Sequence, residues 1–240
     1  MHIYLINLDK DKERLIKADL QLRTADIEYE RFPAIYAKEM SQIDRDTVVN
    51  YFRWWCCIGR KILIGEIGCA LSHYKIYQKM ISENIPYICI LEDDVILKNG
   101  FKETINKVEK WLNPQKPQVV LLSNHIEEPE IGNEIREINN GICSESYIIT
   151  LPAAKALLKE NLPLKVPCDH WSRWKKLGII HLYMTIPSVC NQDFNGFESN
   201  MIESINLKSV KKMSVIEYVL HIFKRLIGKS IDNFLSALGY

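Results

Sequence analysis

The sequence lacks any apolar run long enough to cross a membrane, which takes roughly 18 residues or more. Its first residues, Met1 to Leu8, have a strand-like pattern without the basic, apolar and small-residue segments of a secretory signal peptide. Low-complexity tracts and repeats of fixed period are also missing, which argues against disorder and solenoid folds. We therefore expect a cytoplasmic protein, or one at the inner face of the cytoplasmic membrane.

The sequence also has no Cys-x-x-Cys pair, and its seven cysteines are an odd number. Several of them lie inside apolar runs, as Cys89 does. This pattern predicts free, largely buried thiols in a reducing compartment rather than a disulfide framework.

Strong net charge is absent as well, since the formal net charge is +1 over 240 residues. Residues 1–205 carry 25 basic and 28 acidic residues, which gives no attraction to nucleic acid. Residues 206–240 carry six basic and two acidic residues. With 47% apolar residues, the composition predicts one folded domain over 1–205 and a basic helical tail over 206–240.

Strand and helix patterns alternate from the first residue to about position 125. The predicted strands cover residues 2–8, 28–34, 87–91, 118–123, 146–150 and 179–186. The predicted helices cover residues 10–23, 65–84, 101–112 and 152–161, while residues 40–61 read as irregular or as short helices. The fold is therefore expected to be α/β, with a mainly parallel sheet flanked by helices and ligands beyond the carboxyl ends of the strands.

An acidic triplet, Glu92-Asp93-Asp94, follows the apolar strand 87–91. Adjacent carboxylates repel one another unless a cation lies between them. If the strand alternation continues, Glu92 and Asp94 point to the same side and can hold Mg²⁺ or Mn²⁺ with a diphosphate. The alternative is a solvated loop that caps the next helix.

Two glycines, Gly65 and Gly68, open the long helix over residues 65–84. A helix start with glycines allows close approach of an anion to the backbone N–H groups. By itself this pattern is weak, because such glycines often serve packing and His73 is as readily a structural histidine.

Together these segments resemble glycosyltransferase family 25, the bacterial lipopolysaccharide or lipooligosaccharide glycosyltransferases that are related to collagen galactosyltransferases. The residues that carry the resemblance are Ile6-Asn7-Leu8-Asp9 with Arg14, Phe32-Pro33-Ala34, Gly65-Glu66-Ile67-Gly68-Cys69 with Ser72-His73, Leu91-Glu92-Asp93-Asp94 and Ser146-Tyr147-Ile148-Ile149-Thr150. The resemblance covers about residues 1–200. Tyr36, in place of a frequent Asp, and Glu92, as the first acid, depart from the family pattern.

The resemblance implies a GT-A-type nucleotide-binding fold, a UDP-sugar donor that is often UDP-galactose, and an inverting transfer to a sugar hydroxyl. It also implies a metal ion at the acidic triplet, and we assign Glu92, Asp94 and Asp193 to it. Residues expected to bind or shape the donor nucleotide-sugar are Asn7, Arg14, Glu66, Ser72, His73 and Asp93. Arg14 has an equal alternative as a helix-surface ion pair, and Asp193 as a plain loop residue.

Asp169 is our candidate for the base that takes the proton of the acceptor hydroxyl. It lies after a proline-rich bend and beside Trp171 and Trp174, which suit stacking on a sugar. The alternative is that Asp169 caps a helix that begins at His170.

The tail has two interpretations. Its apolar residues between 214 and 227, with flanking Lys and Arg, are typical of a helix on an anionic membrane surface, where a lipid-linked acceptor resides. The other interpretation is a helix that packs on this protein or on a second subunit as a homodimer. Two other functions also stay open: a nucleotidyltransferase, and a non-catalytic binding module on the same fold.

Overall fold

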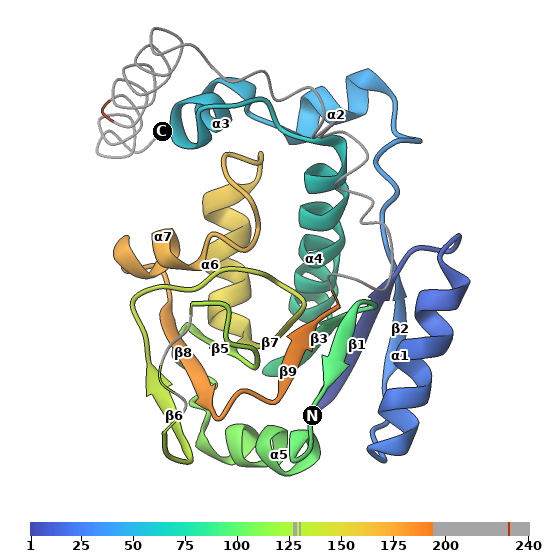
Figure 1. Cartoon of the computed structure of the whole chain (residues 1–240). Helices are drawn as coiled ribbons and strands as arrows, with labels where there is room; N and C mark the ends of the chain where they lie inside the picture. The colour runs from blue at the N-terminus through green and yellow to red at the C-terminus, as the bar shows by residue number, and fades with distance from the viewer. Residues whose placement is uncertain (127–128, 130, 194–229, 231–240) are drawn as a thin grey trace, which may run out of the picture. The chain divides into compact units, whose positions relative to one another are not determined.

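The computed structural model describes residues 1–126, 129, 131–193 and 230 (Figure 1). Its strands are β1 (His2–Asn7), β2 (Glu30–Pro33), β3 (Tyr87–Glu92), β4 (Val95–Leu97), β5 (Gln118–Leu121), β6 (Glu134–Glu137), β7 (Ser146–Thr150), β8 (His181–Ile186) and β9 (Cys190–Gln192). Its helices are α1 (Lys12–Thr24), α2 (Gln42–Val48), α3 (Tyr51–Ile58), α4 (Ile64–Ser82), α5 (Phe101–Trp111), α6 (Leu151–Asn161) and α7 (Trp171–Lys176). The predicted tail over 206–240 lies outside the described residues, except for Ser230.

The described residues form two compact units. The first holds residues 1–35, 71–160 and 168–193, and the second holds residues 36–70 and 161–167 with Ser230. Within residues 1–205, where one domain was predicted, the described chain thus contributes to both units, and the long helix α4 begins in the second unit and continues into the first.

The first unit is built on a seven-stranded sheet in the order β2-β1-β3-β7-β5-β8-β6. The strands β1, β2, β3, β5 and β8 run in one direction, while β7 and β6 run in the other. This confirms the predicted α/β class with helices around a largely parallel sheet. The reversed strand β7 lies in the middle of the sheet, which the alternation of helices and strands did not reveal.

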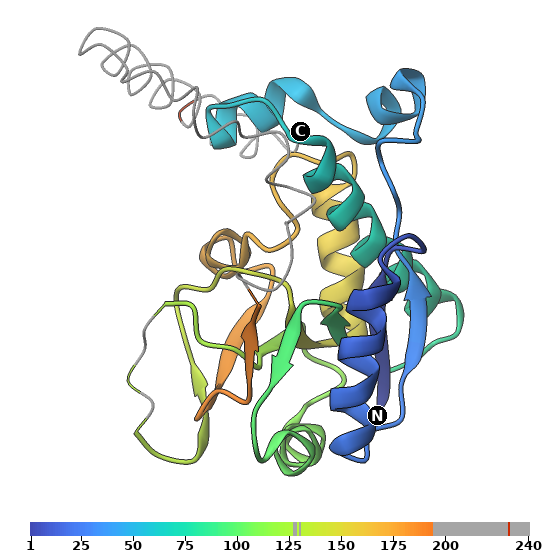
Figure 2. The same cartoon turned by 45° about the vertical axis from the view of Figure 1, so that its right-hand side comes forward.

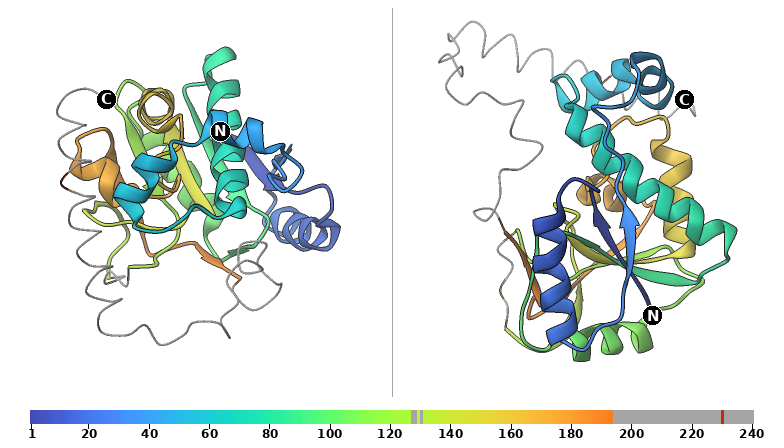
Figure 3. Two further views of the ribbon diagram at one scale, coloured as in Figure 1. Left: turned by 90° about the horizontal axis from the view of Figure 1, so that it is seen from above. Right: turned by 90° about the vertical axis from the view of Figure 1, so that its right-hand side faces the viewer.

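Helices cover both faces of this sheet. Alternate residues of the central strands, such as Leu5 and Leu91, pack in one core cluster with Ala18 of α1 and Phe101 of α5. The other face carries α6 and the part of α4 that belongs to this unit, as the views of Figure 3 agree. Strands that are buried on both faces read as continuous apolar runs, which explains why β3 was recognisable in the sequence.

A small two-stranded sheet, in which β4 pairs with β9, lies next to α1 (Figure 2). Gln21 of α1 fixes this arrangement, because its side chain donates to Val95 O at 3.1 Å and accepts from Leu97 N at 2.9 Å. The pairing brings residues 190–192, late in the sequence, beside the chain that follows β3.

The second unit contains the two short helices α2 and α3 in the segment predicted as irregular or as short helices. Buried Asn161 organises the loop after α6, since its Oδ1 accepts from Lys165 N and Val166 N and its Nδ2 donates to Val166 O. A parallel bridge between Val49 and Leu164 ties this loop to the chain between α2 and α3.

All seven cysteines are free, as predicted. In the part of the chain that the structure describes, no helix combines the length and the hydropathy that a membrane span requires.

Candidate functional site

Polar residues gather at the edge of the sheet where the parallel strands of the first unit end. Asn7 ends β1 and Glu92 ends β3, and these two strands are direct neighbours. Because β7 runs the other way, the residues before it, Ser144 and Glu145, reach the same edge: Glu92 N donates to Glu145 O at 2.8 Å.

The acidic triplet is divided between a strand and a turn. Glu92 is the last residue of β3, whereas Asp93 and Asp94 form the turn into β4. The strand alternation on which the shared side of Glu92 and Asp94 was predicted does not extend to Asp94, because the strand ends at Glu92. The two carboxylates still repel each other, and this repulsion adds to the raised pKa of Asp94. The turn instead brings Asp93 and Asp94 together on one guanidinium, while Glu92 has different partners.

That guanidinium belongs to Arg14 in the first turns of α1. Its Nη2 lies 2.7 Å from Asp93 Oδ1 and 2.9 Å from Asp94 Oδ2. Asn7 completes the contact by donating its Nδ2 to Asp93 Oδ2 at 2.7 Å. The ion pair of Arg14 is thus made with the acidic turn and not along the helix surface.

The electrostatics of the turn show a deficit of positive charge. Burial raises the pKa of Asp93 to about 6, and Arg14 and Asn7 offset this only in part. Burial, with repulsion from Glu92, raises the pKa of Asp94 to about 7. Asp94 Oδ1 is buried and accepts no hydrogen bond from the described residues. An oxygen-rich turn with an unsatisfied buried carboxylate oxygen fits a hard divalent cation.

Gln192 and Asp193 meet this turn through the β4–β9 pairing. Gln192 Nε2 donates to Asp94 Oδ2 at 3.1 Å, and Asp193 N donates to Asp94 O at 2.8 Å. The carboxylate of Asp193 pairs with Lys17 of α1. The structure thus places Asp193 beside Asp94, although 98 residues separate Gln192 from Asp94 in the sequence.

Glu92 ends a buried chain of hydrogen bonds. Tyr77 Oη lies 2.6 Å from Tyr147 Oη, Tyr147 Oη lies 2.7 Å from His73 Nδ1, and His73 Nε2 lies 3.2 Å from Glu92 Oε1. Ser144 Oγ donates to the same Glu92 oxygen at 2.6 Å. Burial opposes ionisation of Glu92, but the bonds from His73 and Ser144 prevail and lower its pKa.

An ionised Glu92 only accepts, so His73 Nε2 donates to it. In the tautomer that carries its proton on Nε2 alone, His73 accepts at Nδ1 from the Tyr147 hydroxyl, and the Tyr147 oxygen then accepts from the Tyr77 hydroxyl. His73 is buried, so it orients Glu92 from the protein interior and does not line an open pocket.

We expect Tyr147→Phe to lower the free energy of unfolding by about 1–3 kcal/mol, because it removes a buried partner from both His73 and Tyr77. Tyr77→Phe, at the far end of these hydrogen bonds, leaves the contact between Tyr147 and His73 in place and should cost about 0.5–1.5 kcal/mol. Urea denaturation followed by tryptophan fluorescence measures both. Equal effects of the two substitutions would contradict the central position of Tyr147 between His73 and Tyr77.

Asp169 lies in the same unit as Glu92, and the two carboxylates interact electrostatically. Its Oδ2 accepts from Cys143 N at 3.0 Å, and burial, followed by repulsion from Glu92, raises its pKa. The helix after it begins at Trp171, with His170 as the N-cap residue and no capping hydrogen bond from a side chain. The predicted capping role of Asp169 is therefore wrong.

The two tryptophans beside Asp169 do not offer a surface to a sugar. Trp171 and Trp174 are both buried, and Trp171 Nε1 donates to Cys143 O at 2.7 Å. The expectation that they stack on a sugar is wrong. Their spacing of three residues places both on the face of α7 that packs in the core.

Ser72 and Glu66, expected near the donor, have structural partners. Ser72 is buried and its Oγ accepts from Ile35 N at 2.8 Å. Glu66 belongs to the second unit, where it forms a two-point ion pair with Arg60 and accepts from Leu63 N.

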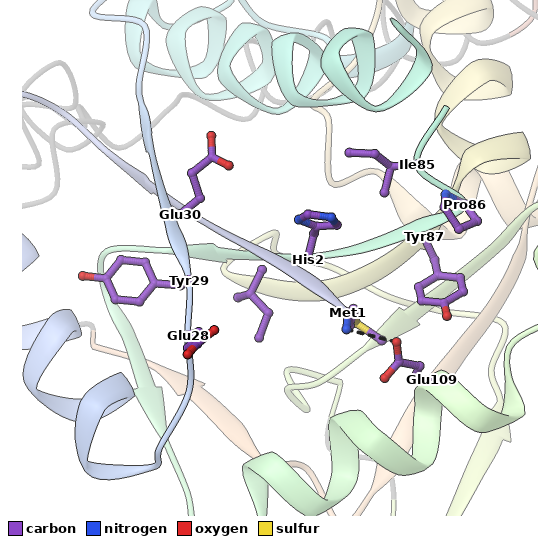
Figure 4. Close-up of a pocket in the computed structure, with 10 residues that line it drawn as sticks. Met1, His2, Glu28, Tyr29, Glu30, Ile85, Pro86, Tyr87 and Glu109 are labelled. Carbon is purple, nitrogen blue, oxygen red and sulfur yellow. Dashed lines mark ion pairs between the residues drawn. The ribbon is translucent and has the colours of Figure 1, made fainter. Parts of the chain in front are cut away.

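The pocket in Figure 4 lies at the opposite edge, where β1, β2 and β3 begin. It has a volume of about 520 Å³, and Met1, His2, Glu30, Tyr87 and Glu109 are among its lining residues. The Met1 amino group pairs with Glu109 Oε1 at 3.0 Å. We place the functional site at the acidic turn instead, because three adjacent carboxylates and the buried, unsatisfied Asp94 Oδ1 lie there.

Comparison with known proteins shows the family of the chain. The family model described as "Glycosyltransferase family 25 (LPS biosynthesis protein)" matches residues 1–172. The chain belongs to glycosyltransferase family 25. This confirms the resemblance drawn from the motifs and supports a transferase.

Three relatives illustrate the breadth of the family. A glycosyltransferase 25 family member of Aedes aegypti is 29% identical and covers 71% of this chain, and lipooligosaccharide biosynthesis protein lic2B of Haemophilus influenzae is 29% identical and covers 65%. Procollagen galactosyltransferase 1-A of Xenopus laevis is 26% identical and covers 70%. The aligned parts are 30%, 62% and 30% of these relatives, so the chain spans about a third of the insect and frog proteins.

Two residues at this edge of the sheet were not predicted from the sequence. Ser144 and Glu145 precede a strand, whereas the rule for parallel sheets directs attention to the residues that follow one. Only the knowledge that β7 is antiparallel would have pointed to them.

Proposed function

We propose that this family 25 protein is an inverting glycosyltransferase that moves galactose from UDP-galactose to a saccharide acceptor in lipopolysaccharide or lipooligosaccharide synthesis. The observation that carries the proposal is the acidic turn at the carboxyl edge of the sheet, with its buried, unsatisfied Asp94 Oδ1. Two relatives support the acceptor class and the sugar, since one is named for lipooligosaccharide biosynthesis and the other is a procollagen galactosyltransferase.

Asp94 is the residue that we expect to hold Mn²⁺ or Mg²⁺ first, with Glu92 and Asp193 as further ligands. Asp94 offers its unsatisfied oxygen. The hydrogen bonds of Glu92 from His73 and Ser144 both go to Oε1, which leaves Oε2 for a metal. Asp193 follows β9, which pairs with β4 beside the turn. When bound, such an ion neutralises charge on the leaving nucleoside diphosphate.

Arg14 and Lys17 would share that work from α1. Both now pair with carboxylates of the site, Arg14 with Asp93 and Asp94 and Lys17 with Asp193. If a divalent ion takes over these carboxylates, the two cationic side chains are released toward phosphate oxygens, where a guanidinium binds in a forked geometry.

The remaining predicted donor residues act through position. Asn7 holds Asp93, His73 holds Glu92, and Ser72 fixes the chain after β2 through Ile35 N. We assign Asp93 to the donor sugar or its basic neighbour and keep Glu66 as a proposed donor-site residue of the second unit.

Asp169 is the proposed base. Its raised pKa, caused first by burial, suits a carboxylate that takes a proton from the acceptor hydroxyl. As the hydroxyl oxygen bonds to the anomeric carbon, its proton passes to Asp169 and the bond to the diphosphate breaks.

The acceptor is proposed to be lipid-linked and the tail over 206–240 to meet an anionic leaflet, or else a second copy of the chain. Both proposals concern residues outside the described part and rest on the basic, apolar pattern of the tail.

A screen of UDP-sugars tests the proposed function. We expect UDP release that depends on both Mn²⁺ and a saccharide acceptor, with UDP-galactose giving the fastest rate. Release of UDP from another UDP-sugar only would contradict the proposed donor, and the absence of release from every UDP-sugar would contradict the activity.

A further inference from the structure

A second group of metal-binding side chains lies on the segment between β5 and β7. His125 Nε2, Cys143 Sγ and a carboxylate oxygen of Glu145 all lie within 4.8 Å of one another. None of the three residues belongs to the acidic turn, and no motif of the family resemblance includes them. Their atoms are a nitrogen, a sulfur and an oxygen, whereas the acidic turn offers oxygens alone.

Glu145 points to a cation at this place. The residue is 1% exposed, and one of its carboxylate oxygens lies 2.6 Å from His125 Nε2. The other, Oε2, is buried and accepts no hydrogen bond from the described residues. A buried carboxylate oxygen without a partner costs free energy that a bound cation would offset.

The backbone at Cys143 holds its thiol in this group at a conformational cost. Its φ is 68°, in the left-handed region that a residue with a Cβ rarely adopts. Two contacts keep it there: Cys143 N donates to Asp169 Oδ2 at 3.0 Å, and Cys143 O accepts from Trp171 Nε1 at 2.7 Å. A glycine would fit this backbone better, so the side chain of Cys143 is held at a cost in backbone free energy.

We propose that His125, Cys143 and Glu145 form a binding site for a zinc-class divalent cation, distinct from the acidic turn. Imidazole, thiolate and carboxylate are the ligands that Zn²⁺ takes, and a thiolate disfavours Mg²⁺ and Mn²⁺. Three protein ligands leave a fourth position for water, which can reach the site because His125 is 14% exposed.

Binding requires a small local change. Ligand atoms around a tetrahedral Zn²⁺ lie about 3.4 Å apart, given bonds of about 2.0–2.3 Å. The distance between His125 Nε2 and Glu145 Oε1, now 2.6 Å, must therefore increase by about 0.8 Å. As the metal binds, the thiol of Cys143 loses its proton to solvent, and His125 Nε2 gives up the proton of its hydrogen bond to Glu145, which leaves a neutral imidazole with its proton on Nδ1.

The cation would stiffen the support of Glu92. Ser144, between the two ligands Cys143 and Glu145, donates to Glu92 Oε1, and Glu145 O accepts from Glu92 N. A metal on both neighbours of Ser144 fixes these two contacts, so the second site acts on the proposed active site through position.

Titration of the full chain with Co²⁺ tests this site, because a Co²⁺–thiolate bond gives a charge-transfer absorption in the near ultraviolet. We expect the band to saturate at one Co²⁺ per chain and to disappear when Zn²⁺ is added. Removing an outer-shell partner of a metal typically weakens binding 10–100-fold, so loss of a ligand should weaken it by at least about 100-fold.

Cys143→Gly is the sharpest variant, since it removes the thiol and suits the positive φ. It should abolish the band while the chain stays folded by circular dichroism. Cys57→Ser, at a half-buried cysteine of α3, is the matched control and should keep it. His125→Gln should weaken Co²⁺ binding, and Asp94→Asn should leave the band unchanged.

Absence of the band in the wild-type chain would overturn the proposal, as would a band that Cys143→Gly leaves intact. A band lost in Asp94→Asn but retained in His125→Gln would also overturn it, because the metal would then belong to the acidic turn. None of these outcomes bears on whether the chain transfers a sugar.

Discussion

Replacing Asp94 by asparagine should lower kcat/KM for sugar transfer on the order of a thousandfold. The substitution keeps the shape of the side chain but removes the negative charge with which Asp94 is proposed to bind the metal. Loss of one electrostatic contact to the charge of a transition state costs about 10²–10³ in rate, and loss of a metal ligand should lie at the upper end. Steady-state UDP release at several donor concentrations measures the change.

Two controls make the Asp94→Asn result interpretable. Asp46→Asn, at an exposed position of α2 in the second unit, should leave the rate unchanged. The folded fraction of Asp94→Asn should match the wild type, because burial already disfavours the charged form of this carboxylate. A kcat/KM within about threefold of wild type would exclude Asp94 as a metal ligand. A threefold change corresponds to a loss of less than about 1 kcal/mol of transition-state stabilisation, which is too small for the loss of a metal ligand.

Asp169→Asn should lower kcat by about 10²–10⁴, the range that a general base contributes. Asparagine has nearly the same shape and can still accept from Cys143 N through its carbonyl oxygen, so the segment should keep its fold. Donor binding should be unchanged, since the base acts on the acceptor. Turnover at saturating donor and UDP affinity by calorimetry separate the two effects.

The Asp169 assignment has its own contradicting result. Near-normal kcat in Asp169→Asn would exclude it as the base and leave only its structural bond to Cys143 N. A loss of UDP affinity equal to the loss of rate would instead place Asp169 in the donor site.

The sequence predicted the elements of the fold wherever burial imposes a clear pattern. The central residues of β3 and β7 are apolar and buried because helices cover both faces of the sheet, and the predicted ranges of the two strands match to within a residue. The helices α4 and α5 also appear where their spacing places them. Local pattern carries this information because burial acts residue by residue.

Strand direction and turn geometry left no such trace. The sequence of β7 is equally compatible with either direction, so the contribution of Ser144 and Glu145 to the site was not predictable. The division of the acidic triplet was missed for a related reason: the pattern does not show that β3 ends at Glu92. Which side chain contacts Arg14 depends on that turn.

Long-range pairing explains the rest. Asp193 meets Asp94 because β9 pairs with β4, a contact between segments far apart in the sequence. The suggestion that Asp193 joins the metal shell came only from its polarity after a strand. The predicted sugar-stacking role of Trp171 and Trp174 was wrong because both are buried. The sequence does not distinguish an aromatic residue that lines a site from one that fills a core.

The central claim is that Asp94 joins a divalent cation to the donor diphosphate, and calorimetric titration of UDP with and without Mn²⁺ tests it most directly. In the wild-type chain, Mn²⁺ should raise the affinity for UDP at least about tenfold, or about 1.4 kcal/mol. In Asp94→Ala, Mn²⁺ should have no effect on UDP binding. An equal gain from Mn²⁺ in wild type and Asp94→Ala would contradict the claim.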